Sequence, residues 1–63
     1  MDQWIADAVG KMHIHGIAHK DLAEHLDMNS KYLSTILNGH RTPKGAREKI
    51  ESAINEIIAE QQK

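Results

Sequence analysis

The chain has 63 residues, no cysteine, and a formal net charge of −1 with its five histidines counted as neutral. A chain of this length buries only about 60% of the surface that its unfolded form exposes, so we expect one hydrophobic core and a single domain over residues 1–63. The lack of cysteine excludes disulfides and thiolate metal sites, and no apolar run is long enough for a signal peptide or membrane span, which predicts a cytoplasmic protein without membrane partners.

The first predicted helix lies between Asp2, a candidate N-cap, and Gly16, a residue type favoured just beyond a helix end. Gly10 lowers the stability of this helix by up to about 1 kcal/mol relative to alanine. Its apolar residues recur at helical spacing and predict one buried face, made of Ile5, Ala8, Val9 and Met12.

Two short helices are predicted next, over about residues 19–26 and 30–37. Both carry apolar residues three and four positions apart, which places each set on one helix face. The two sets are Leu22, Ala23 and Leu26, followed by Leu33, Ile36 and Leu37.

The turn between these helices is short, so the helices cross closely and need a small residue at the crossing, which Ala23 provides. Asp27 is the candidate for a left-handed turn residue, because aspartate is one of the few non-glycine residues that visit this conformation. Asn29 is the candidate N-cap of the following helix.

Thr42 and Pro43 predict the start of a fourth helix, since proline is tolerated at the first helical position. The helical period then continues almost to the chain end, before a polar tail from Glu60 to Lys63. No segment alternates as a strand does, so we expect an all-α fold of four helices. The apolar positions of the fourth helix are Ala46, Ile50, Ala53, Ile54, Ile57 and Ile58.

The stretch from Ile17 to Gly39, IAHKDLAEHLDMNSKYLSTILNG, resembles the lambda-repressor-like (Cro/repressor, or XRE) DNA-binding domains of phage and bacterial regulators. The similarity extends from about Trp4 to about Ile58. It implies a compact bundle of four helices, or five as in many relatives, with a helix-turn-helix formed by helices two and three. Two positions depart from the family pattern: Ala18 replaces a capping Thr or Ser, and Asp27 replaces a turn glycine.

Charge is unevenly distributed along the chain. Residues 28–47 contain no carboxylate and four cations, whereas the flanking segments are acidic. A solvated surface explains most such runs, but this one coincides with the third helix and the loop after it, which the family lays against DNA. The four cations are Lys31, Arg41, Lys44 and Arg47.

The resemblance implies that the third helix enters the major groove with its N-terminal end first. Lys31 would then donate to guanine O6 and N7, Asn29 would pair with adenine, and the Thr35 methyl would meet a thymine methyl. Asn29 has an alternative role as a helix cap only. The residues expected to read bases are Asn29, Ser30, Lys31 and Thr35.

Phosphate contacts are expected at the start of the second helix and after the third. Tyr32 lies at a position beside the DNA backbone in the family, with core packing as its alternative role. The expected phosphate-binding residues are His19, Tyr32, Asn38, Gly39, His40, Arg41, Lys44 and Arg47.

The histidines do not form a metal or catalytic pattern. His13 and His15 are two residues apart and face different ways, and Gly16 interrupts the helix between His15 and His19. We therefore expect no enzyme activity, no metal, no cofactor and no small-molecule ligand.

The last apolar residues of the fourth helix leave two alternatives open. Ile54, Ile57 and Ile58 either form a dimer interface or close the core against Trp4 and Ile5. A symmetric dimer would suit a pseudo-palindromic operator with half-sites about 34 Å apart.

Two functions follow from these patterns. The first is a phage or bacterial transcriptional regulator that binds double-stranded DNA by sequence. The alternative is an antirepressor-like modulator that keeps the fold but binds another regulatory protein, which the acidic flanks and the apolar end of the fourth helix would suit.

Overall fold

The computed structural model describes residues 2–62 as four helices joined by short connections. The helices are α1 (Gln3–Ile14), α2 (His19–His25), α3 (Ser30–Leu37) and α4 (Ala46–Gln61). No strand occurs in this part of the chain. The all-α prediction is confirmed, and one long helix occupies the C-terminal third.

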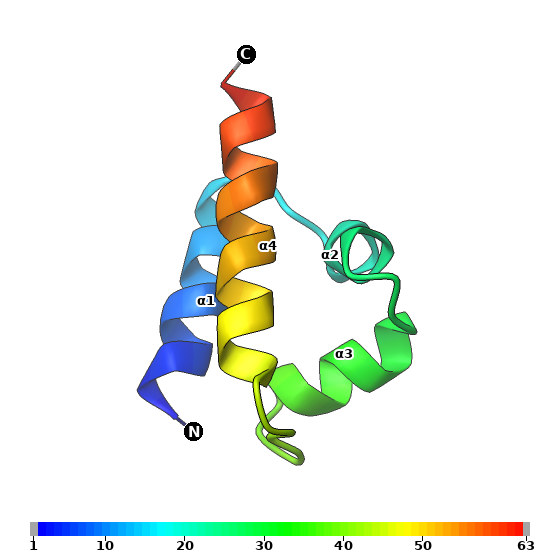
Figure 1. Ribbon diagram of the computed structural model, residues 1–63. Coiled ribbons are helices and arrows are strands. Elements are labelled where there is room, and N and C mark those ends of the chain that lie inside the picture. Colours follow the sequence, from blue (N-terminus) through cyan, green and yellow to red (C-terminus); the bar gives the residue numbers. More distant parts are fainter. Residues whose placement is uncertain (1, 63) are drawn as a thin grey trace.

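The long helix α4 lies between two groups of elements (Figure 1). Helix α1 runs beside it in the same direction, and α2 and α3 pack against each other on its other side. Two hydrogen bonds join α1 and α4: Lys11 Nζ donates to Asn55 Oδ1 at 3.2 Å, and Gln61 Nε2 donates to the His15 carbonyl at 3.0 Å. These bonds hold the C-terminal halves of the two helices together.

The core is apolar throughout, with no buried polar or charged residue among residues 2–62. Each helix contributes the face that its sequence period predicts. The prediction that Val9 belongs to the buried face is wrong, because Val9 is 36% exposed and lies outside the core. The buried residues are Ile5, Ala8, Met12, Ile17, Leu22, Ala23, Leu33, Ile36, Leu37, Ala46, Ile50, Ala53 and Ile54.

Helix α2 ends at a left-handed residue, as predicted for Asp27, whose φ is 54°. The Met28 N–H donates to the Ala23 carbonyl at 2.8 Å, and the Asp27 N–H donates to the Glu24 carbonyl at 3.1 Å. This pair of bonds is a Schellman motif, which satisfies the last carbonyls of a helix and reverses the chain. Helices α1 and α3 end in the same way at glycine residues.

The start of α4 differs from the prediction. Pro43 is not the first helical residue, because the helix begins at Ala46. Gly45 adopts φ 81° and ψ −1°, and the Ala46 N–H donates to the Pro43 carbonyl at 3.0 Å. This is the geometry of a type II turn with glycine at its third position. The left-handed glycine separates the proline from the helix.

No helix within residues 2–62 combines the length and the hydropathy needed to cross a membrane.

Replacement of Asp27 by glycine should raise the free energy of unfolding by about 0.5 kcal/mol, because glycine adopts a positive φ without steric cost. Asp27→Ala should lower it by about 1 kcal/mol, which corresponds to roughly 4–8 °C in Tm for a domain of this size. Asp27→Asn is the control and should leave stability near wild type, because asparagine tolerates this conformation. Urea unfolding followed by circular dichroism measures the free energy of unfolding of each variant. An alanine variant as stable as the glycine variant would contradict the expected ranking.

Candidate nucleic-acid interface

Helices α2 and α3 and the four residues between them form a unit that we call the α2–turn–α3 unit (residues 19–37). Its inner side is closed by Leu22, Ala23 and Leu33, each at most 2% exposed. The small Ala23 lies at the close crossing, as the sequence predicted. Burial of one face of α3 leaves Ser30 and Lys31 exposed at its N-terminal end.

Asn29 caps α3. Its Oδ1 accepts a hydrogen bond from the Lys31 backbone N–H at 2.8 Å, which confirms the capping role. The cap uses one lone pair of the amide oxygen and holds the side chain against the helix end. Any contact of Asn29 with a base must therefore start from this orientation.

Thr35 also turns its polar group inward. Its Oγ1 donates to the Lys31 carbonyl at 3.0 Å, one turn earlier in α3. The hydroxyl proton is therefore not available to a base acceptor. The methyl group is the part of Thr35 that can contribute a specific contact, as expected for a thymine methyl.

His19 and Ser34 connect α2 to α3. His19 Nδ1 and Ser34 Oγ lie 3.1 Å apart, with the donor set by the histidine tautomer. No sequence pattern pointed to Ser34, because the two residues are fifteen positions apart and their contact depends on the crossing of the helices. The contact leaves the Nε2 of His19 as the nitrogen for a phosphate.

The first turn of α2 is less suited to phosphate than the sequence suggested. Ala18 has no side-chain acceptor to cap the helix. The Ala18 N–H instead donates to Asp21 Oδ2 at 3.3 Å, which places a carboxylate at this helix end. That negative charge occupies the position where the helix dipole would attract an anion.

The backbone after α3 forms part of the predicted phosphate site. Its N–H groups already serve the end of α3: Asn38 donates to Ser34, Gly39 to Ile36 and His40 to Thr35, at 2.9–3.1 Å. A helix that closes its own last carbonyls in this way uses the N–H groups that an anion needs. These backbone N–H groups are therefore not free to bind an anion.

Tyr32 and Arg41 come together beside the loop. With Thr42 and Pro43 they line a shallow recess of about 340 Å³. Tyr32 is half-buried and packs against the core, so its packing role is confirmed. Its ring also forms one wall of a recess that has an exposed arginine on the other side, a combination that suits a phosphate.

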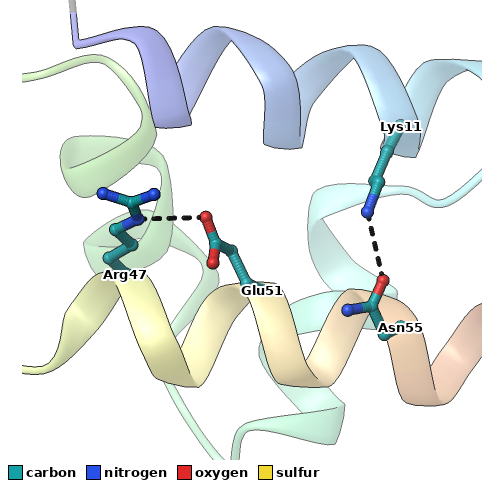
Figure 2. Close-up of polar contacts among 4 residues, drawn as sticks. All are labelled: Lys11, Arg47, Glu51 and Asn55. Atoms are coloured by element: carbon teal, nitrogen blue, oxygen red, sulfur yellow. Dashed lines mark hydrogen bonds and ion pairs between the residues drawn. The ribbon is translucent and has the colours of Figure 1, made fainter.

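The four cations of residues 28–47 do not share one environment. Lys31, Arg41 and Lys44 are exposed. Arg47 is a departure, because its Nε donates to Glu51 Oε1 at 3.2 Å on the side of α4 that faces α1 (Figure 2). Both side chains are partly exposed, so this i,i+4 ion pair is a weak surface interaction.

The predicted interface residues of α4 lie mainly in the core. Ile54 is 1% exposed, so it has no surface to offer a partner. Ile57 and Ile58 are half-buried and pack against the core, as does Trp4. This agrees with the alternative in which the end of α4 closes the core.

Within residues 2–62 no group of three or more His, Asp or Glu side chains is placed to hold a metal ion. Comparisons of the chain with family models, curated proteins and solved structures find no match.

Asn29 offers a test that separates helix capping from DNA contact. Asn29→Ala should lower the free energy of unfolding by about 1 kcal/mol, because the Lys31 N–H loses its acceptor. Asn29→Asp keeps an acceptor oxygen and should leave stability near wild type. Thermal unfolding measures both, and an alanine variant as stable as the aspartate variant would show that the cap contributes nothing.

Proposed function

We propose that the protein is a transcriptional regulator of Cro/repressor type that binds double-stranded DNA by sequence, with α3 in the major groove. The observation that carries the proposal is the exposed N-terminal end of α3 together with the charge around it. Three exposed cations lie on α3 and the following loop, in a segment without a carboxylate. Such a focused positive surface on a projecting helix suits the phosphates and base edges of a duplex.

Lys31 is the main base-reading residue in this proposal. It is exposed in the first turn of α3, and its ammonium group can donate to guanine O6 and N7. Ser30 is exposed beside it and supplies a short hydroxyl. Asn29 and Thr35 add less hydrogen bonding, since the acceptor of one and the donor of the other are engaged within α3.

The surrounding side chains set affinity and register. Arg41 and Lys44 supply charge from the loop, Tyr32 and Arg41 form a phosphate recess, and His19 contacts the DNA backbone through Nε2. These contacts raise the affinity for duplex DNA of any sequence and do not distinguish one base pair from another. The protein would act in the cytoplasm of a bacterial cell by occupying an operator and obstructing transcription.

Charge reversal on α3 and on the loop tests this proposal. Lys31→Glu or Arg41→Glu should abolish binding to random duplex DNA, measured by fluorescence anisotropy at several salt concentrations. Wild-type affinity should fall steeply with salt, by a slope of about −0.9 for each phosphate neutralised. Lys49→Glu is the matched control, because Lys49 is an exposed cation of α4 outside the positive segment.

If Lys49→Glu lowered the affinity for DNA as much as Lys31→Glu does, the loss would reflect the net charge of the protein and not a specific surface. A wild-type protein without affinity at low salt would remove the DNA-binding proposal.

A second candidate is an antirepressor-like modulator of another regulatory protein. The inward bonds of Asn29 and Thr35 favour it, because they reduce what α3 can read, and the net charge of −1 opposes general affinity for DNA. On this alternative Ile57→Asp or Ile58→Asp should abolish regulation while Lys31→Glu leaves it intact. Circular dichroism of each variant separates loss of a partner from loss of folding.

A further inference from the structure

The outer face of α1 carries apolar surface that the monomer leaves uncovered. Ile14 is 78% exposed and Val9 is 36% exposed, and they are the two exposed large hydrophobic residues of residues 2–62. Ala6 is exposed as well. Val9 lies about 140° around the helix from Ile14, so it belongs to another side, and the outer face is made by Ile14 and Ala6.

Gly10 lies at the centre of this face, four residues from Ala6 and four from Ile14, so the three form one row. Nothing in the monomer requires glycine here. Its φ is not positive, and a Cβ built on it would have no atom within 4 Å. Glycine weakens the middle of a helix relative to alanine. What glycine does provide is close approach of another backbone.

A groove of about 560 Å³ runs beside this row, between α1 and α4. Its lining includes the apolar residues Ala8 and Ile54 and the polar residues Lys11, Glu51 and Asn55. Figure 2 shows the polar pairs that these three residues form between α1 and α4 and within α4. Lys11 reaches Asn55 at 3.2 Å, and Arg47 reaches Glu51 at 3.2 Å. The face is thus an apolar strip with charged margins.

The charge along α1 is antisymmetric. Asp2 precedes the helix and Asp7 lies in its N-terminal half, whereas Lys11 lies in its C-terminal half. A second α1 that crosses at Gly10 in the antiparallel sense brings each acidic end to a basic end. A parallel crossing would bring like charges together.

We propose that two copies of this chain associate through α1, antiparallel, with a two-fold axis beside Gly10. In this register Ile14 of one copy covers Ala6 of the other, and Asp7 of one copy lies near Lys11 of the other. Such an interface is isologous, since one patch serves both copies. The groove beside Gly10 receives the protruding Ile14 side chains.

The contact is small, because α1 is 12 residues and about 18 Å long. An interface of this kind belongs to the weak class that buries less than about 1,200 Å². We expect a dimer that forms in the micromolar range and dissociates on dilution. The association does not rest on the proposed DNA binding, because α3 is not part of this face.

Sedimentation equilibrium over the micromolar to millimolar range tests the proposal with two variants. Gly10→Gln should raise Tm, because glutamine is a better helix former, and yet raise the dissociation constant about tenfold or more, because its side chain holds the helices apart. Ile14→Gln should weaken association with little effect on Tm. Ser52→Gln, which adds bulk at an exposed position of α4, is the control and should change neither.

Charge exchange tests the antiparallel sense. Asp7→Lys and Lys11→Asp should each weaken association, and the double variant should recover it, because every pair across the axis is then reversed and matched. Asp7 accepts a hydrogen bond from Gln3 Nε2 at 3.0 Å within one copy, so the single variants are compared for Tm as well.

A wild-type chain that stays monomeric at the highest concentration would overturn the proposal. So would a dimer that is indifferent to Gly10→Gln and Ile14→Gln, which would place the interface elsewhere, or a double charge variant as weak as the single ones.

Discussion

The orientation of α3 depends on the chain reversal at Asp27. The left-handed φ of this residue lets the Met28 N–H return to the Ala23 carbonyl, and that bond ends α2 within one turn. With α2 ended there, Asn29 can cap α3 at once, and the two helices cross over the small side chain of Ala23. A longer or looser turn would free α3 to rotate, and Leu33 could no longer reach the core while Lys31 stays in solvent.

The small size of α3 limits the number of side chains that it could offer to a partner. A helix of eight residues has few exposed side chains, and here Asn29 and Thr35 bond to the α3 backbone while Ser34 contacts His19 of α2. These bonds hold the helix and its neighbour in place. They also leave Lys31 and Ser30 as the freest polar side chains at the N-terminal end of α3. Under the proposed function, recognition through so few direct contacts would depend strongly on phosphate contacts and on the shape of the duplex.

Local sequence patterns predicted the features that local physics determines. The bounds of α3, its asparagine cap and the left-handed Asp27 all depend on residues within a few positions of each other. The features that were missed depend on distant residues or on competition between neighbours. His19 contacts Ser34 only because the helices cross, and Arg47 pairs with Glu51 because α4 places the carboxylate one turn further on. Pro43 fits the local pattern of a helix start, but the turn from Pro43 to Ala46 places the left-handed Gly45 between the proline and α4.

The two long helices differ in how much of their surface the monomer uses. Helix α4 has neighbours on two sides, and its last isoleucines still find contact with the core, so little apolar surface is left over. Helix α1 has α4 on one side, and its outer side holds an exposed isoleucine and a glycine that the monomer does not require. A sequence pattern cannot separate these cases, because both helices carry apolar residues beyond a single stripe. The distinction comes from packing, because α4 lies at the centre of the fold and α1 lies at its edge. An apolar residue outside the main stripe is therefore covered on α4 and exposed on α1.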